Sequence, residues 1–229
     1  MKTTRPFVLV NMAMTADGKI ATANGSVNSC GSKRDLEHLY ELRATADAVL
    51  VGARTADAQD VHLGPGGVKY RRLRKKRGLA EYNLRIIVSG SGSIKPRAKI
   101  FQHKFSPLII LTTHRAPKKV VERLRILATE VKVFGKKEIN FVAALRWLRK
   151  KWKVRRLLCE GGGELNDIFF RKGLVDELHL TVCPKIFGGR DAPTIVDGKG
   201  FSRLADALPL KLKSMRRFGD EMYLVFTPA

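Results

Sequence analysis

The sequence is poor in cysteine, in aromatic residues and in long apolar runs, and each shortage excludes a class of protein. Cys30, Cys159 and Cys183 show neither C-x-x-C pairing nor metal-ligand spacing, so we predict three buried thiols and no metal site. Aromatic residues make up only 7% of the chain. No apolar run reaches the length of a membrane span, and no A-x-A cleavage signal follows the first residues. These absences predict a cytoplasmic protein that does not enter a membrane.

Acidic residues are also scarce, because 21 Asp and Glu stand against 44 Lys and Arg, which gives a formal net charge of +23. Such an excess suits nucleic acids and phosphorylated small molecules alike. The densest basic block, KYRRLRKKR, covers residues 69–77. No zinc finger, basic zipper or aromatic RNA-binding signature accompanies it. We therefore favour a solvated basic surface, and nucleic-acid binding is the alternative from another class.

The 229 residues show no internal repeat and no low-complexity linker, which predicts a single domain over residues 1–229. Short apolar runs typical of buried strands cover 7–14, 47–52, 84–88, 108–111 and 131–134, and helical patterns separate several of them. The segment between 57 and 83 is expected to be a long irregular loop. Residues 210–215 and 222–226 indicate an antiparallel hairpin. The order predicts an α/β fold with a mixed, mainly parallel sheet flanked by helices.

The stretch 154–173, VRRLLCEGGGELNDIFFRKG, combines a buried strand, a glycine turn and a helix that ends near Gly173. Three glycines allow the backbone to pass close to a bulky anion, and the following helix adds the positive end of its dipole. A plain connection is an equally good interpretation of the glycines alone, since neither G-x-G-x-x-G nor a P-loop is present. Glu160, at the carboxyl end of the strand, favours a ligand site.

Two polar residues are expected among apolar neighbours. Asn11 interrupts the strand 7–14, so a backbone group or a ligand must satisfy its amide. A helix should start near Lys33, where Ser32 and Asp35 resemble a capping box. Helical spacing then brings Arg43 to the core-facing side of that helix, where its guanidinium needs an anion or a path to solvent.

Three segments together resemble the reductase of riboflavin biosynthesis, a dihydrofolate-reductase-like domain that acts on ribosylaminopyrimidine 5′-phosphates. They are 11–21 (NMAMTADGKIA), 42–55 (LRATADAVLVGART), and 160–163 (EGGG) with 173–178 (GLVDEL) and 184–189 (PKIFGG). Their order and spacing extend over nearly the whole chain. No H-x-E plus P-C-x-x-C signature of an attached deaminase is present. The chain is therefore similar to the stand-alone reductases of archaea and fungi.

The resemblance implies a three-layer fold with helices on both faces of the sheet, and it implies roles for individual residues. A nicotinamide dinucleotide would contact Thr55, Gln59 and Asp60, and its adenosine ribose and 2′-phosphate would lie at Val88, Ser89, Gly90 and Ser91. Its pyrophosphate would lie on Gly161, Gly162, Gly163 and Glu164. The substrate would contact Asn11, Arg43, Leu63 and Glu160, and by position the candidates for proton transfer are Glu160 and Asp17.

One segment departs from the family pattern. The family usually has T-x-x-x-D-D-P-x-L after the second strand, whereas this chain has Gln59 at the first acidic position and Asp60 at the second. The ribose or nicotinamide contact implied at the first acidic position would therefore come from an amide instead of a carboxylate.

The implied reaction is NADPH-dependent reduction of the ribosyl side chain of 2,5-diamino-6-(ribosylamino)-4(3H)-pyrimidinone 5′-phosphate to the ribitylamino product, with NADH as an alternative cofactor. A homodimer is expected. The alternative substrates are 5-amino-6-(5-phosphoribosylamino)uracil and a pterin or dihydrofolate.

Overall fold

The computed structural model describes residues 4–25, 30–57 and 61–229. The chain forms two compact units, each built from two separate stretches: residues 1–7 and 40–158 form unit 1, and residues 8–39 and 159–229 form unit 2. The expectation of a single domain over 1–229 stays a prediction. Within the described residues, no helix combines the length and the apolar character that crossing a membrane requires.

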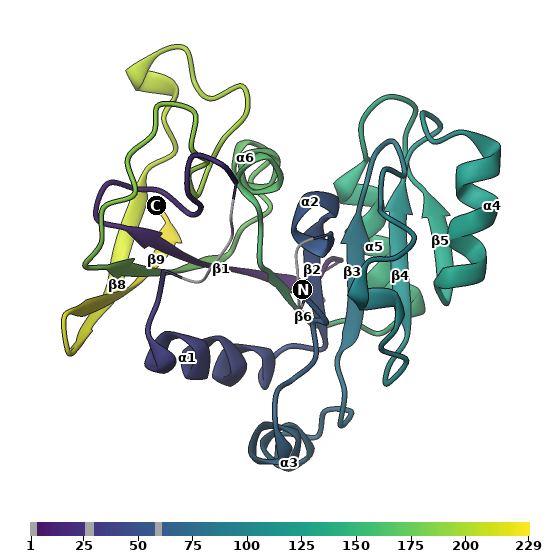
Figure 1. The fold of residues 1–229 in the computed structure, drawn as a ribbon, viewed down its shortest axis with the longest axis horizontal. Coiled ribbons are helices and arrows are strands. Elements are labelled where there is room, and N and C mark those ends of the chain that lie inside the picture. The colour runs from purple at the N-terminus through teal and green to yellow at the C-terminus, as the bar shows by residue number, and fades with distance from the viewer. Residues whose placement is uncertain (1–3, 26–29, 58–60) are drawn as a thin grey trace. The chain divides into compact units, whose positions relative to one another are not determined.

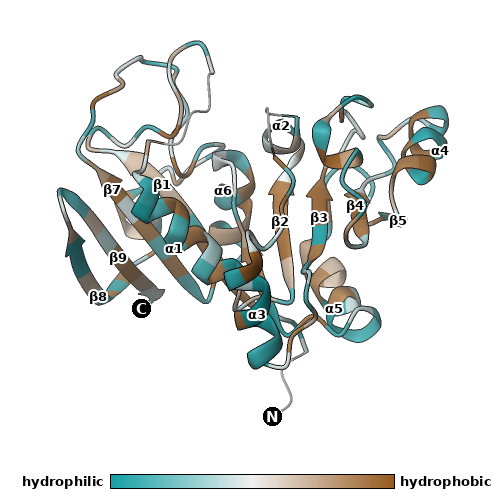
Figure 2. Ribbon diagram, turned by 60° about the horizontal axis from the view of Figure 1, so that its bottom comes forward, coloured by the Kyte–Doolittle hydropathy of each residue, from teal (hydrophilic) through white to brown (hydrophobic). Residues whose placement is uncertain are grey.

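Unit 1 contains strands in the hydrogen-bonded order β5-β4-β3-β2-β6 (Figure 1). Their bounds are β2 Ala48–Gly52, β3 Leu84–Val88, β4 Leu108–Thr112, β5 Glu130–Val133 and β6 Arg156–Cys159, whose last residue belongs to unit 2. The pairs β2–β3, β3–β4 and β4–β5 are all parallel. Valine, isoleucine and leucine fill these strands, as a parallel sheet buried on both faces requires, and β2 is largely brown in Figure 2.

The helices of unit 1 are α2 (Ala53–Ala56), α3 (Val68–Lys76), α4 (Lys118–Leu127) and α5 (Phe141–Lys151), with a short 3-10 turn at Lys99–Phe101. One side of α5 is apolar and packs in the core, because Phe141, Ala144, Leu145 and Leu148 are all buried. Asn140 caps this helix, and its Oδ1 accepts the Ala143 N–H at 3.0 Å.

Unit 2 contains strands in the order β1-β7-β9-β8. They are β1 (Phe7–Thr15, starting at the last residue of unit 1), β7 (Glu177–Cys183), β8 (Leu210–Phe218) and β9 (Glu221–Pro228). β1 and β7 are parallel, whereas β9 is antiparallel to both β7 and β8. The predicted C-terminal hairpin is therefore confirmed. The unit also holds α6 (Gly163–Arg171), a 3-10 turn at Leu204–Asp206 and the first part of α1 (Lys33–Arg43).

The two faces of the β1–β7 pair carry different chemistry. Register places Asn11 beside His179 and Ala13 beside Thr181 on one face, and Met12 beside Leu180 on the other. α1 covers the first face, since His38 stacks on His179 at 5.6 Å between ring centroids. The glycine turn before α6 meets the second face, because a Cβ on Gly161 would lie 2.8 Å from the Met12 sulfur. α1 and α6 accordingly lie on opposite sides of β1 in Figure 1.

These observations confirm the predicted α/β class with a mixed, mainly parallel sheet and a C-terminal antiparallel hairpin. One expectation is wrong, because residues 68–76, assigned to an irregular loop, form α3. The sequence pattern did not predict this helix, because its buried side carries Arg74 where an apolar residue would be expected. Arg74 is 1% exposed and donates from Nη1 to the carbonyl oxygens of Arg43 and Ala46, both at 2.6 Å.

Candidate functional site

The carboxyl ends of β2, β3 and β4 meet at one edge of unit 1. Register aligns Gly52 with Val88 and Val88 with Leu111, so the segments that follow these residues leave the sheet together. α2, which carries the half-buried Thr55, follows β2 directly. The edge of a parallel sheet where strands end is a common ligand site in α/β proteins.

The turn after β3 is fixed by the end of β4 and by α2. Thr113 Oγ1 donates to the Gly90 carbonyl at 2.7 Å, and Asp57 Oδ1 accepts the Lys95 N–H at 2.9 Å. Ser91 Oγ donates to Ser93 Oγ at 3.0 Å. The structure thus brings Thr55, Val88, Ser89, Gly90 and Ser91 to one edge, although the cofactor contact expected of them stays a prediction. Gln59 and Asp60 lie outside the described residues.

A second group in unit 1 surrounds Arg43 at the end of α1. Its side chain is buried, as helical spacing predicts, and its Nη1 donates to the Gly64 carbonyl at 2.7 Å. The guanidinium also lies 5.6 Å from the centroid of the Tyr40 ring. Leu63, the residue before Gly64, has φ 57°, a left-handed conformation that is unusual for leucine, and Asn83 Nδ2 holds its carbonyl at 2.8 Å. The structure therefore places Arg43 and Leu63 in one group.

In unit 2, the glycine turn leads from β6 into α6. Gly161 has φ +74°, and Gly162 is the N-cap of α6. A Cβ on Gly163 would overlap the Asp197 carboxylate and approach the Thr194 carbonyl to 2.6 Å. The backbone N–H groups of a first helical turn have no intrahelical acceptor, and Gly162, the N-cap residue of α6, has no side chain with which to cap them. This end of α6 fits an anionic group such as a pyrophosphate.

Two predicted carboxylates flank the glycine turn. Glu160 follows β6 and is half-buried, while Glu164 lies exposed in the first turn of α6. The dipole of α6 stabilises a negative charge at this end. The assignment of Glu160 to proton transfer and to substrate contact, and of Glu164 to the cofactor, stays a prediction.

Asp17, the other candidate for proton transfer, joins two distant segments. One carboxylate oxygen accepts the Thr15 hydroxyl at 2.5 Å and the Phe187 N–H at 3.2 Å, and the other accepts the Gly188 N–H at 2.7 Å. The hydrogen bond from Thr15 is the main cause that lowers the pKa of Asp17 to about 2. Such a carboxylate is ionised at neutral pH and has no proton to donate. These hydrogen bonds give Asp17 a structural role, and its assignment to proton transfer stays a prediction.

Asn11 lies on the face of β1 that α1 covers. Its side chain is 9% exposed, and its Oδ1 has no hydrogen-bond partner among the residues that the structure describes. A buried amide oxygen without a partner costs about 1–3 kcal/mol unless a ligand or water satisfies it. The sequence-based expectation that Asn11 needs an additional partner agrees with this geometry.

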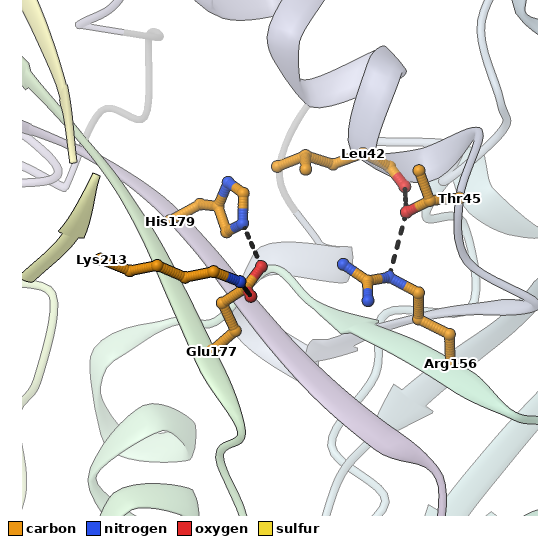
Figure 3. A network of polar contacts seen from close by, with 6 residues as sticks. All are labelled: Leu42, Thr45, Arg156, Glu177, His179 and Lys213. Carbon is orange, nitrogen blue, oxygen red and sulfur yellow. Dashed lines mark hydrogen bonds and ion pairs between the residues drawn. The ribbon is translucent and has the colours of Figure 1, made fainter. Parts of the chain in front are cut away.

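The sequence interpretation missed polar side chains of β7 that share this face. Glu177 accepts hydrogen bonds from Lys213 at 2.8 Å and contacts His179 Nε2 at 2.6 Å (Figure 3). Although burial raises it, these hydrogen bonds from Lys213 and His179 hold the pKa of Glu177 below its ordinary value. The alternation in ELHLTVC could have identified this polar stripe, because every second residue of a strand faces the same side.

Figure 3 also shows a polar group that belongs to unit 1. Arg156 Nε donates to Thr45 Oγ1 at 3.1 Å, and the Thr45 hydroxyl donates to the Leu42 carbonyl at 2.7 Å. This group ties the start of β6 to the turn after α1, next to Arg43. Among the described residues, no cluster of three or more His, Cys, Asp or Glu side chains could hold a metal ion.

Comparisons with known proteins identify relatives of the whole chain. The RibD C-terminal domain family matches residues 6–224. The 2,5-diamino-6-ribosylamino-4(3H)-pyrimidinone 5′-phosphate reductase of Methanothermobacter thermautotrophicus is 36% identical over 97% of this chain and 98% of its own length. The riboflavin biosynthesis protein RibD of Actinobacillus pleuropneumoniae is 28% identical, and the match covers all of this chain but 59% of that protein.

A likeness to a solved structure supports the fold. Acinetobacter baumannii RibD superimposes with a TM-score of 0.77 at 21% identity, over 100% of this chain and 60% of that one. The expected dihydrofolate-reductase-like fold is thereby confirmed.

Proposed function

The chain belongs to the family of the RibD C-terminal domain and is a reductase of riboflavin biosynthesis, and from this premise we propose its substrate, its cofactor and the residues that hold them. The substrate is 2,5-diamino-6-ribosylamino-4(3H)-pyrimidinone 5′-phosphate, which the enzyme converts to the ribitylamino product. The observation that carries this proposal is the 36% identity to the archaeal reductase over 97% of this chain.

The cofactor in this proposal is NADPH, with NADH as the alternative. Gly161, Gly162, Gly163 and Glu164 hold the pyrophosphate, which the glycine at the N-cap of α6 supports. Thr55 and the turn from Val88 to Ser91 hold the ribose and the 2′-phosphate, which the shared carboxyl edge of β2, β3 and β4 supports. Gln59 and Asp60 belong to the same proposal. When bound, the nicotinamide supplies a hydride to C1′ of the ring-opened sugar.

The substrate in this proposal contacts Asn11, Arg43, Leu63 and Glu160. Arg43 supplies a positive charge for the phosphate. Its hydrogen bond to the Gly64 carbonyl orients the guanidinium before substrate binds, which reduces the side-chain entropy lost on binding. Asn11 supplies an amide whose Oδ1 has no partner among the described residues. Asp17 positions the loop at Phe187 and Gly188 through its carboxylate.

A cytoplasmic homodimer completes the proposal. Every residue of β8 is exposed, including Leu212 at 54% and Met215 at 64%, and β8 is the last strand in the order β1-β7-β9-β8. An exposed edge strand with apolar side chains is a ready surface for pairing with a second copy.

Separate titrations and turnover measurements test this function. The purified protein is titrated with NADPH and with NADH, and each complex is then mixed with the diaminopyrimidine substrate, its deaminated counterpart or dihydrofolate. We expect saturable NADPH binding and turnover of the diaminopyrimidine. Arg43→Ala should raise the KM for substrate at least tenfold and leave the Kd for NADPH within about twofold, because Arg43 is a proposed substrate contact and not a proposed cofactor contact. Turnover of dihydrofolate alone would overturn the proposal.

A further inference from the structure

A buried carboxyl group lies on the α1 side of unit 2 and has no role in the site described above. Asp35, in the first turn of α1, is 7% exposed. Its carboxyl group shares a hydrogen bond with the side chain of Thr181 on β7. Gly31 packs directly against it, because a Cβ at that position would overlap the Asp35 carboxylate. The local backbone is therefore shaped around this one acidic group.

A second carboxylate, Glu221 at the start of β9, lies close enough to Asp35 to affect its ionisation. Glu221 accepts the Ser32 N–H at 2.5 Å, the Ser32 hydroxyl at 2.7 Å and the Tyr223 hydroxyl at 2.6 Å. Although burial raises it, the hydrogen bonds from Tyr223 and Ser32 hold the pKa of Glu221 below its ordinary value. Glu221 is therefore the ionised member of the pair.

Asp35 differs from Glu221 because it lacks such a set of donors. Burial raises its pKa, the Thr181 hydrogen bond opposes this only in part, and the negative charge of Glu221 raises the pKa further. Two neighbouring carboxyl groups with pKa values displaced in opposite directions are the usual arrangement of an acid beside a spectator carboxylate. Asp35 is therefore the weaker acid of the two carboxyl groups.

The side-chain amide of Asn11, whose oxygen has no hydrogen-bond partner among the described residues, indicates a ligand site next to Asp35. Asn11 and Ala13 share a face of β1, and their register partners are His179 and Thr181, the residue that holds Asp35. Asp35 therefore contacts the position two residues along the strand from the partner of Asn11, on the face that α1 covers. Asn11 Oδ1 is buried and has no hydrogen-bond partner within the described part of the chain, as expected of an acceptor that a bound polar ligand satisfies.

A cavity gives Glu221, the carboxylate beside Asp35, access to water. It measures about 450 Å³ and is lined by Cys30, Ser32, Lys185 and Glu221, among others. Glu221 therefore faces both the buried acid and the cavity. Water in this cavity therefore reaches the carboxylate next to Asp35.

We propose that Asp35 is the acid that protonates the substrate during reduction. The inference rests on the proposed function, in which the ring-opened sugar presents a C=N bond. As C1′ takes up a hydride, which brings both electrons, the π bond breaks and the nitrogen takes the Asp35 proton. A C–H and an N–H bond form, Asp35 becomes a carboxylate, and solvent reprotonates it. No other reactant is needed.

The groups that face this acid set its pH dependence. They are Glu221 and Tyr223 from β9, Cys183 from β7 and Cys30. Around them lie His38 of α1, which contacts His179 and Tyr223, and Lys185, which acts on Cys30. Turnover should fall as the pH rises through the pKa of Asp35, because the carboxylate can no longer donate a proton. Binding of NADPH should not change over that interval.

Asp35→Asn tests the proposal, and Glu37→Gln, a half-buried acid of the same helix paired with Arg34, is the matched control. We expect Asp35→Asn to lower kcat at least about 100-fold, the usual contribution of a general acid, with NADPH affinity within about twofold of wild type. The variant should also lose the alkaline decline of kcat. Because burying an ionised Asp35 costs stability, wild type should lose more thermal stability than Asp35→Asn as the pH rises. A purely structural residue would instead destabilise the variant at every pH.

Infrared difference spectroscopy gives a readout that does not depend on turnover. Wild type should show the carbonyl stretch of a protonated carboxylic acid at a pH where exposed aspartates are ionised, and Asp35→Asn should lack that band. Wild-type kcat in Asp35→Asn, or the absence of the band in wild type, would overturn the proposal. If wild type bound NADPH but did not reduce the ribosylaminopyrimidine, both the proposed function and the role of Asp35 would fail. Normal turnover by Asp35→Asn would overturn only the role of Asp35.

Discussion

At the scale of single residues, several of the scarce acidic side chains hold together segments that lie far apart in the sequence. Asp47 Oδ2 accepts the Arg156 N–H at 2.8 Å, and Asp176 Oδ2 accepts the Val8 N–H at 2.7 Å. Asp17 and Glu221 do the same for Gly188 and Ser32. A carboxylate that accepts a backbone N–H satisfies a buried donor and gains a charge-assisted hydrogen bond.

The local sequence predicts only part of such an arrangement. Ser32 and Asp35 resemble a capping box, in which Asp35 would accept the Ser32 N–H. In the structure Glu221, 189 residues away, accepts that N–H, and Asp35 turns to Thr181. Local spacing identified the start of α1 correctly but could not identify the partner, because the hairpin that supplies Glu221 is placed by tertiary packing.

Asp17→Asn should weaken the hydrogen bonds to the backbone N–H groups of Phe187 and Gly188. The effect should be clearest in the pH dependence of thermal stability. The pKa of Asp17 is lowered to about 2, below the ordinary value for aspartate, so its stabilising contribution is complete above the unfolded pKa and is lost as the pH falls towards 2. We expect thermal midpoints to differ at pH 7, with wild type higher, and to converge in acid. Parallel melting curves from pH 7 to pH 2 measure this, and a constant difference would contradict the role assigned to Asp17.

At the scale of elements, the glycine turn and α6 are constrained more tightly than a plain connection requires. Gly163 faces Asp197 and the Thr194 carbonyl, and Asn166 Nδ2 donates to the Ile195 carbonyl at 2.8 Å. The segment 194–197 therefore packs against the start of α6. The sequence predicted the strand, the turn and the helix, but it contained no signal for the segment that packs on them.

Gly163→Ala should move the start of α6, because the new methyl group would overlap the Asp197 carboxylate. Overpacking of this kind costs about 1–3 kcal/mol. We expect NADPH affinity to fall at least tenfold, measured by calorimetric titration. Gly67→Ala is the control, since a Cβ there meets nothing within 4 Å. Equal NADPH affinity in both variants would contradict the pyrophosphate assignment.

Arg74→Met should destabilise unit 1, because α3 is docked by a buried guanidinium. Burial lowers the pKa of Arg74 to about 10, so it remains charged at neutral pH while donating to the carbonyls of Ala80, Arg43 and Ala46. Methionine keeps much of the volume but leaves these acceptors unpaired, which predicts a loss of about 2–4 kcal/mol in urea unfolding.

The exposed Arg72→Met, on the same helix, is the control for that loss and should change stability by less than about 0.5 kcal/mol. Similar losses in both variants would show that Arg74 does not dock α3. The helix itself escaped prediction for the same physical reason, since its buried side carries Tyr70 and Arg74 instead of an apolar stripe.

At the scale of the whole molecule, the fold class followed from the order of apolar runs, because strands that alternate with helices leave few arrangements. Positions of side chains at the site did not follow. Thr55 and Ser89 follow strands that end at the same edge only because β2 and β3 are in register, and Asn11 and Asp35 share a face only through β7. Register and face are set by packing between segments, which composition and local spacing do not record.

The net charge of +23 should make stability depend on salt. Mutual repulsion of the basic side chains destabilises the compact state, and raising ionic strength from 0.01 M to 0.15 M shortens the Debye length from about 30 Å to about 8 Å. A gain of about 1 kcal/mol would raise the midpoint by about 2–4 °C for a chain of this size. Calorimetry in sodium chloride at pH 7 measures the shift, and an unchanged or lower midpoint would contradict the repulsion argument.

The most direct measurement follows hydrogen from cofactor to product. The enzyme is incubated with NADPH deuterated at the transferring position and with 2,5-diamino-6-ribosylamino-4(3H)-pyrimidinone 5′-phosphate, and the product is analysed by mass spectrometry. We predict a ribitylamino product that carries one deuterium on C1′ and one solvent-derived proton on nitrogen. Unchanged substrate, or a product without deuterium, would contradict the account.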